Sequence, residues 1–237
     1  MKTKQKKKIK NKPNLKYLLR YGMHMMKYPF MTDKKIFQEI YRKNIWGSSE
    51  TVSGYGSTLS QTTTILNSLP ALFEKYNIKS LLDIPCGDFH WMKNIARGAI
   101  KYTGADIVDE LIENNIETYQ DYGQFMVLDI CSSPLPKTDL IFCRDCLVHF
   151  SFPKIINALN NILQSDSKYL LLTNFPDCRY NLNTITGTWR ALNFCREPFN
   201  FPEPLEVIFE KPAYRSNKYS DKSLALWNIE KLKISYC

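Results

Sequence analysis

Acidic side chains recur along the middle of the chain, each directly after a short apolar run. They are Asp83, Asp106, Asp129 and Asp145. A short apolar run between turn signals is typical of a buried parallel strand. In an open α/β sheet, ligands bind over the carboxyl ends of such strands. We therefore expect these carboxylates to share one ligand-binding edge, although each acid alone would also suit an ordinary strand end or helix cap.

The first acid belongs to residues 80–92, which we interpret as a strand at 80–84, a tight turn, and a helix at 90–96. The N-terminus of a helix has free N–H groups that suit a polar or anionic ligand. Pro85 lacks an N–H, so the turn has one donor fewer for a pyrophosphate. This disfavours a nicotinamide dinucleotide as the ligand.

The positions of the next two acids relative to the glycine turn and the predicted strands suit a bound nucleoside. Asp106 lies nineteen residues after Gly87, where an acid can accept hydrogen bonds from ribose hydroxyls. Asp129 follows the third predicted strand and would accept from an adenine amino group, with Ile130 as apolar cover. Asp88 would accept from a ligand ammonium or cap the following helix.

A second set of reactive side chains follows the fourth predicted strand. His149 is a candidate general base, because an unperturbed histidine pKa near 6.5 suits proton removal near neutral pH. Asp145 would orient the acceptor or act as the base itself. Arg144 would hold an anionic acceptor or form a structural ion pair. A histidine that simply packs at a helix start is the plainer alternative for His149.

Two loops are expected to form the walls of the site. The loop at 46–57 carries three of the nine glycines of the chain and is expected to close over the ligand. The segment at 183–193 carries Trp189, Arg190 and Asn193, which suit a sugar or a phosphate. The Arg190 guanidinium would bind a phosphate or carboxylate through two parallel N–H groups. A packed surface loop is the alternative for this second segment.

The elements that must position these residues alternate between strand and helix. Strands are predicted at 80–84, 102–106, 125–128, 139–143 and 169–173, and helices at 15–30, 34–42, 58–76, 90–96, 108–120 and 153–163. Asp33 is the predicted N-cap of the second helix. The alternation predicts an α/β fold with a Rossmann-like, doubly wound and mostly parallel sheet. Strands at 205–210 and 223–228 are expected to form an antiparallel hairpin at its edge.

Over residues 79–173 the chain resembles the class I S-adenosylmethionine-dependent methyltransferases. Asp83-Ile-Pro-Cys-Gly87 is similar to their first motif, with Pro85 replacing its first glycine and Phe89 its last. The resemblance implies S-adenosylmethionine as the cofactor, with Asp106 and Asp129 as the ribose and adenine acids. The implied cofactor-binding residues are Trp46, Gly56, Ser57, Asp83, Pro85, Cys86, Gly87, Asp88, Asp106, Ile107, Asp129, Ile130 and Arg144.

A wider pattern at 37–227 resembles a bacterial subgroup of these enzymes that is found beside surface-polysaccharide genes. Its motifs are Trp46-Gly47, Ser53-Gly-Tyr-Gly-Ser57, Pro85-Cys-Gly-Asp-Phe89, Cys143-Arg-Asp145 with His149, and Thr186-Gly-Thr-Trp-Arg190. This resemblance implies methyl transfer to a small molecule in capsule or surface-polysaccharide biosynthesis. The expected acceptor is an oxygen of a sugar, a nucleotide-sugar or a phosphorylated metabolite. The implied catalytic residues are His149, Asp145 and Arg144, and the implied substrate-binding residues are His90, Trp91, Asn174, Trp189, Arg190 and Asn193.

The net charge of +9 is concentrated at one end of the chain. Seven lysines and no acid lie in the first twelve residues, which leaves a net charge of +2 for the rest. We expect residues 1–12 to be a disordered basic tail. A helical extension with the active-site loop is expected at 13–78, and the methyltransferase domain at 79–237. The nearly neutral body disfavours a stable nucleic-acid partner.

Other functions stay open at this point. They are an RNA methyltransferase, a non-catalytic S-adenosylmethionine-binding partner protein and a nicotinamide oxidoreductase. Seven scattered cysteines fit reduced thiols and a cytoplasmic protein. Cys143 and Cys146 have zinc-like spacing, but a zinc site needs further ligands, so we expect buried thiols and no metal. No apolar run reaches the roughly 18 residues of a membrane span. We expect a monomer or homodimer.

Overall fold

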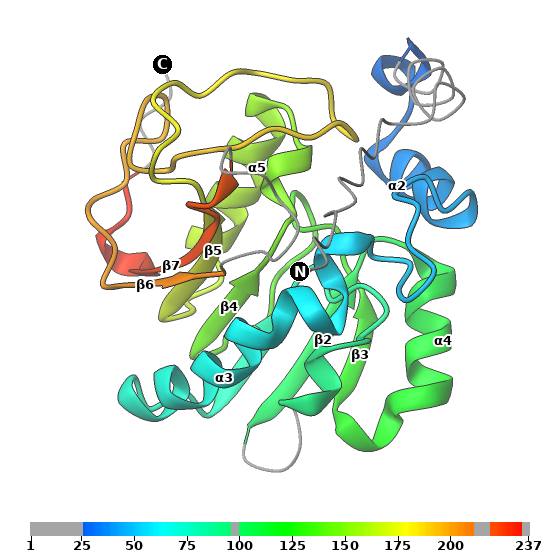
Figure 1. Cartoon of the computed structure of the whole chain (residues 1–237), viewed down its shortest axis with the longest axis horizontal. Coiled ribbons are helices and arrows are strands. Elements are labelled where there is room, and N and C mark those ends of the chain that lie inside the picture. Colours follow the sequence, from blue (N-terminus) through cyan, green and yellow to red (C-terminus); the bar gives the residue numbers. More distant parts are fainter. Residues whose placement is uncertain (1–25, 96–99, 211–218, 234–237) are drawn as a thin grey trace, which may run out of the picture.

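Seven strands form one mixed sheet in the order β3-β2-β1-β4-β5-β7-β6 (Figure 1). The computed structural model describes residues 26–95, 100–210 and 219–233. The strands are β1 (Ser80–Asp83), β2 (Lys101–Asp106), β3 (Gln124–Val127), β4 (Leu140–Cys143), β5 (Tyr169–Asn174), β6 (Glu206–Phe209) and β7 (Ser223–Asn228). The first five strands pair in parallel, whereas β7 is antiparallel to both β5 and β6. The predicted parallel sheet with an antiparallel edge hairpin is confirmed.

The chain reverses its direction across the sheet between β1 and β4. From β1 it proceeds to β2 and β3 on one side, and then returns to β4 and β5 on the other. Such a reversal leaves an opening over the carboxyl ends of the two central strands, where ligands bind in this architecture. The topology therefore places the ends of β1, β2, β3 and β4 around one opening.

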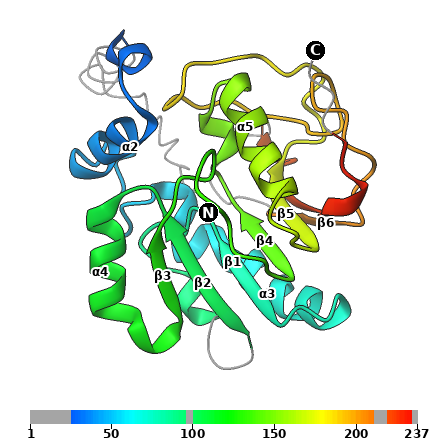
Figure 2. The same cartoon turned by 180° about the vertical axis from the view of Figure 1, so that it is seen from behind.

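Four α-helices lie within one residue of their predicted bounds. They are α2 (Asp33–Arg42), α3 (Leu59–Lys75), α4 (Asp109–Tyr119) and α5 (Phe152–Leu163). Leu81 of β1 packs with apolar residues of α3 and α4, and its neighbour Leu82 packs with those of α5. Successive strand residues point to opposite faces, so both faces of the sheet are covered. Figures 1 and 2 show α3 and α5 on opposite sides of the sheet.

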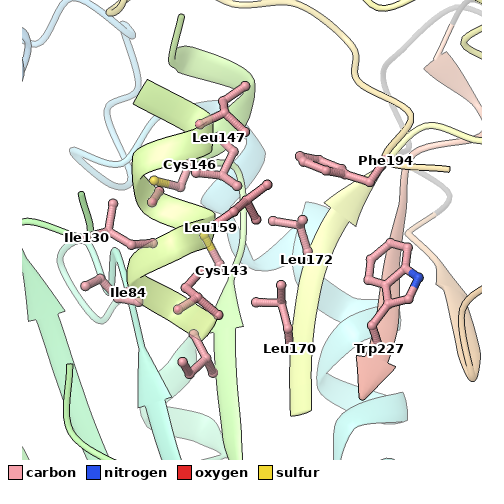
Figure 3. Packing of buried hydrophobic residues seen from close by; sticks show 14 of the residues in the cluster. Ile84, Ile130, Cys143, Cys146, Leu147, Leu159, Leu170, Leu172, Phe194 and Trp227 are labelled. Atoms are coloured by element: carbon pink, nitrogen blue, oxygen red, sulfur yellow. The ribbon is translucent and has the colours of Figure 1, made fainter. Parts of the chain in front are cut away.

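The apolar cluster on the α5 side also holds the C-terminal half of the chain in place. Figure 3 shows Leu159 of α5 against Leu170 and Leu172 of β5, with Phe194 and Trp227 beyond them. The indole N–H of Trp227 donates to the Pro202 carbonyl at 2.8 Å. The long segment between β5 and β6 is therefore anchored to the core.

Cys143 and Cys146 both belong to this apolar cluster, where they are 0% and 7% exposed. Within the described residues, no three His, Cys, Asp or Glu side chains are grouped as a metal site would require. The structure thus places both thiols in a hydrophobic environment.

The N-cap of α2 differs from the prediction. Asp33 is the first helical residue, and the Thr32 hydroxyl accepts a hydrogen bond from the Lys35 N–H at 3.4 Å. The Asp33 carboxylate instead pairs with Lys154 of α5 at 2.7 Å. Asp33 therefore joins two helices rather than capping one.

The helix predicted at 90–96 is also wrong. The described residues contain only a short 3₁₀ turn, Met92–Asn94, and residues 96–99 lie outside the description. Phe89, Trp91 and Met92 are all buried. Phe89, which directly precedes the predicted helix, has φ of +55°, in the left-handed region that an α-helix does not use. The helix N-terminus expected to face the ligand is therefore not formed here.

The basic tail at 1–12 and most of the helix predicted at 15–30 lie outside the described residues. Within the described part, Tyr28–Phe30 is a 3₁₀ turn. No helix there has both the length and the apolar character needed to span a membrane.

Candidate functional site

A pocket lies over the ends of the central strands and is closed on one side by residues 46–57. It brings together most of the side chains predicted from the sequence. These are Trp46, Ser57, Asp83, Pro85, Cys86, Gly87, Asp88, Trp91, Asp106, Ile107, Asp129, Ile130, Arg144, Asp145 and His149. Apolar walls that were not predicted come from Phe37 and Tyr41 of α2, and from Phe142 and Phe150.

Asp106 is tied to the glycine turn by its own carboxylate. One oxygen accepts from the Gly87 N–H at 3.3 Å, and the other accepts from the Val108 N–H at 3.1 Å. The side chain is only 7% exposed, and this burial raises the pKa of Asp106 to about 6. The carboxylate is thus fixed in position at the pocket wall, with acceptor capacity remaining on both oxygens.

Asp83 occupies the floor of the pocket. Its carboxylate accepts from the Tyr102 hydroxyl at 2.7 Å. Burial raises the pKa of Asp83 to about 8. A carboxyl group with such a pKa ionises most readily beside a cation, because an opposite charge favours the charged form.

Asp129 lies half-buried at the pocket wall beyond β3. Its carboxylate accepts from the Cys131 N–H and the Ser132 hydroxyl, each at 2.8 Å. The neighbouring Ile130 is 4% exposed and lines the pocket. The pair therefore offers an oriented acceptor beside an apolar surface.

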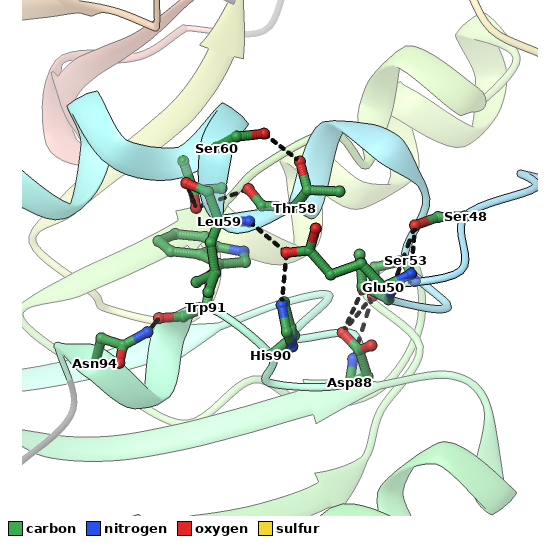
Figure 4. Close-up of polar contacts among 12 residues, drawn as sticks. Ser48, Glu50, Ser53, Thr58, Leu59, Ser60, Asp88, His90, Trp91 and Asn94 are labelled. Atoms are coloured by element: carbon green, nitrogen blue, oxygen red, sulfur yellow. Dashed lines mark hydrogen bonds and ion pairs between the residues drawn. The ribbon is translucent and has the colours of Figure 1, made fainter.

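Asp88 and Glu50 fasten the loop at 46–57 to the glycine turn (Figure 4). The Asp88 carboxylate accepts from the Thr51 hydroxyl, the Val52 N–H and the Ser53 hydroxyl at 2.9–3.0 Å. Glu50 accepts from the first N–H of α3 at 2.7 Å and lies 2.9 Å from the His90 ring nitrogen. Asp88 and His90 are therefore bound by this loop, and His90 does not line the pocket.

Gly87 allows this loop to lie directly against the turn. It has φ of +55°, and a Cβ there would lie 2.2 Å from the Ser53 hydroxyl oxygen. We expect Gly87→Ala to displace Ser53 in addition to straining the backbone, which alone costs about 1–2 kcal/mol. Gly47→Ala is the matched control, since Gly47 has φ of +68° and no neighbour within 4 Å of the added Cβ. Urea unfolding should show a larger stability loss for Gly87→Ala, and equal losses would contradict the close contact.

The His149 ring is oriented by a backbone carbonyl of the long segment between β5 and β6. Its Nδ1 lies 2.8 Å from the Thr188 carbonyl oxygen. A carbonyl only accepts, so Nδ1 carries the proton and Nε2 of the neutral ring keeps a free lone pair. The ring packs against Trp46 with a centroid distance of 5.1 Å. Burial lowers the pKa of His149 to about 4, so the ring is neutral at neutral pH.

Beside His149 lies a group of four charges, which we call the charge quartet: Arg144, Asp145, Glu210 and Lys222. Asp145 is half-buried and the other three are buried. The Arg144 guanidinium binds both oxygens of Glu210, at 3.2 and 2.7 Å. Lys222 contacts Asp145 at 2.5 Å and Glu210 at 3.0 Å. Although burial opposes ionisation, Lys222 and Arg144 hold the pKa of Asp145 below its usual value.

Loop 46–57 contacts the charge quartet as well. The Gly56 carbonyl accepts from Arg144 at 2.8 Å. A Cβ at Gly56 would lie 3.4 Å from the Asp145 carboxylate. Gly56 therefore supports the quartet rather than lining the pocket. Sequence reasoning did not identify Glu210 and Lys222, because they lie more than sixty residues from their partners.

Four predicted substrate-binding residues serve the packing of the long C-terminal segment and do not line the pocket. Arg190 donates to the carbonyls of Leu147, Val148 and Leu182 at 2.8–3.1 Å. Asn174 accepts a hydrogen bond from the Phe194 N–H. Asn193 donates to the carbonyls of Pro176 and Cys178. The Trp189 ring packs against the rings of Phe175 and Tyr219.

These contacts have a common physical reason. A segment without regular structure has carbonyl and N–H groups that need partners when buried. Arginine and asparagine side chains provide those partners here. The Nε and Nη1 groups of Arg190 are thereby used within the protein, whereas its buried Nη2 has no hydrogen-bond partner among the described residues. Arg190 does not line the pocket, as the predicted phosphate contact would require.

Comparison with known proteins gives one family match. A family model described as a methyltransferase domain matches residues 60–211, more than half of the chain. The comparison with curated proteins finds no match.

Several solved structures share the fold at low sequence identity. The methyltransferase domain of bacterial-CtHen1-CN is 9% identical, with a TM-score of 0.53 over 71% of this chain and 99% of that chain. N-methyltransferase NodS from Bradyrhizobium japonicum WM9 is 14% identical, with a TM-score of 0.52 over 73% and 98%. An S-adenosylmethionine-dependent methyltransferase from Clostridium acetobutylicum ATCC 824 is 9% identical, with a TM-score of 0.52 over 69% and 90%. At these identities the likeness is one of fold.

Proposed function

Because the chain belongs to the class I S-adenosylmethionine-dependent methyltransferases, we propose that it methylates an oxygen of a small-molecule acceptor, with His149 as the general base. The observation that carries this proposal is the state of His149. Its Nδ1 is committed to the Thr188 carbonyl, which leaves Nε2 of a neutral ring as a proton acceptor in the pocket.

The pocket residues fit the cofactor. The Asp106 carboxylate is held at the wall by the Gly87 and Val108 N–H groups, and in this position it would accept from the ribose hydroxyls. Asp129 and Ile130 would receive the adenine. Asp83 and the turn at Gly87 would face the methionine part, whose positive charges favour ionised carboxylates. S-adenosylmethionine supplies an electrophilic methyl group on its sulfonium.

The contacts support His149 over Asp145 as the base. Asp145 is already paired with two cations, Lys222 and Arg144, so protonating it would give up both ion pairs. His149 would take the hydroxyl proton of the acceptor on Nε2 as the oxygen bonds to the methyl carbon, while the bond from that carbon to the sulfonium sulfur breaks and leaves a neutral thioether. The nearby negative charge of Asp145 favours the protonated ring. Proton and charge are thus balanced within the site.

The finer identity of the acceptor rests on the sequence motifs. Their resemblance to bacterial polysaccharide-cluster methyltransferases supports an oxygen of a sugar, a nucleotide-sugar or a phosphorylated metabolite in capsule biosynthesis. The aromatic walls from Trp46, Phe37 and Tyr41 are compatible with a sugar ring. We place this reaction in the cytoplasm, in line with the reduced thiols expected from the seven scattered cysteines.

The experiment is a screen of polar metabolites and sugar nucleotides with S-adenosylmethionine and the purified protein. Mass spectrometry should detect an acceptor that gains the mass of one methylene, and the gain should require both cofactor and protein. Calorimetry of the same protein should show cofactor binding. Binding without any methylated product would favour a non-catalytic role, and a product on added RNA would favour the nucleic-acid alternative.

A further inference from the structure

The charge quartet contains two residues that the proposed reaction does not use directly. Glu210 follows β6 and Lys222 precedes β7, so both come from the C-terminal hairpin. They are 2% and 4% exposed and do not line the pocket. They contact Arg144 and Asp145, which do line it, and the charge of Lys222 also lowers the pKa of His149 directly.

We propose that Glu210 and Lys222 are positioning residues, which hold Asp145 as a fixed carboxylate beside His149 and keep the charge quartet neutral, so that the whole quartet sets how readily the histidine takes up a proton. This inference rests on the proposed role of His149. It assigns to the C-terminal hairpin a function in proton transfer in addition to its place in the sheet.

The geometry around Asp145 supports a fixed carboxylate. Its Oδ2 contacts Lys222 at 2.5 Å and Arg144 at 3.4 Å. Its own N–H donates to the Thr173 hydroxyl at 2.8 Å. Within the described residues its Oδ1 has no hydrogen-bond partner. The carboxylate is thus held through one oxygen, while the other remains available at the pocket wall.

The charge balance of the quartet supports a role beyond stability. Two cations and two carboxylates give no net charge. Burying such groups has a large desolvation cost, and well-packed apolar residues often stabilise a protein equally well or better. Because the quartet is neutral, removing any one of its charges changes the net charge near the His149 ring. Loss of one cation would leave a net negative charge near the ring, and loss of one carboxylate would leave a net positive charge.

The test is a pH titration of His149 by NMR, which requires no acceptor. The chain has three histidines, so labelled ring signals can be assigned with a His149→Asn variant. Lys222→Met should raise the titration midpoint of His149 by about one pH unit, as expected for one charge several ångströms away at an effective dielectric near 20. Glu210→Gln should not raise it. Lys222→Arg and the neutral double variant Lys222→Met/Glu210→Gln should return it to the wild-type value.

If Glu210 and Lys222 only stabilise the fold, a different pattern of His149 midpoints is expected. Either single variant would loosen the site, and the His149 midpoint would rise toward 6.5 in both. The same direction in both variants, or no change in Lys222→Met, would overturn the inference. Lys222→Gln provides a second neutral variant if Lys222→Met does not fold. Failure of the proposed function would appear separately, as unchanged turnover in His149→Asn.

Discussion

Asp106→Asn is expected to weaken S-adenosylmethionine binding by about 100-fold. Hydrogen bonds to a charged acceptor each contribute about 1.5–3 kcal/mol, and the Asp106 carboxylate would accept from ribose hydroxyls. The backbone N–H groups of Gly87 and Val108 hold both oxygens in place. An amide would present an NH₂ group to one of those N–H donors, so its orientation would also be lost. Calorimetry with S-adenosylmethionine measures the effect.

The matched control for this variant is Asp121→Asn, an exposed acid after α4 that does not line the pocket. Its cofactor affinity should equal that of the wild type. Thermal unfolding of both variants separates loss of binding from loss of folding. A folded Asp106→Asn variant with wild-type affinity would remove Asp106 from the cofactor site.

The same carboxylate predicts a pH dependence of cofactor binding. Burial raises the pKa of Asp106 to about 6, so it is ionised above that pH and protonated below it. Only the ionised form accepts through both oxygens. Affinity for S-adenosylmethionine should therefore fall as the pH decreases through 6, and this dependence should be lost in Asp106→Asn.

His149→Asn is expected to lower turnover by about 100-fold or more, the usual contribution of a general base. The asparagine amide can still donate toward the Thr188 carbonyl, so the variant removes the proton acceptor with little change in the local hydrogen bonds. Cofactor affinity should remain within about twofold of the wild type, since the base is needed for the transition state rather than for cofactor binding. Steady-state kinetics with the acceptor identified by the screen, together with calorimetry, separates the two effects.

The pH profile gives an independent check on His149. Burial lowers its pKa to about 4, so the ring stays neutral and able to accept a proton down to about that pH. Turnover measured at saturating cofactor should not decline near pH 6.5, where an exposed histidine would become protonated. A decline centred near 6.5 that persists in His149→Asn would assign the titration to another group.

Much of the fold was predictable because it depends on local patterns. Apolar runs of strand length alternate with amphipathic helices, and this periodicity located β1 to β5 and α2 to α5 closely. The predicted helix after Phe89 is instead a short 3₁₀ turn, in a segment whose Trp91 and Met92 are buried by tertiary packing. Local propensity does not include that packing.

What the sequence by itself determined is which acids follow the parallel strands. Parallel strands place their carboxyl ends at one edge, so Asp83, Asp106 and Asp129 had to approach one another once the strands were recognised. Strand periodicity and chain order are enough to bring the three acids together, and no side-chain contact needs to be known.

Only the tertiary structure decided how each side chain is used. Asp88 binds the loop at 46–57, Arg190 serves backbone carbonyls, and Lys222 joins Asp145 across 77 residues of sequence. A buried polar group must find a partner, but the partner is chosen by proximity in space, which sequence spacing does not encode. For the same reason, only the tertiary structure contains the ion pair of Lys222 with Asp145 that favours His149 as the proposed base.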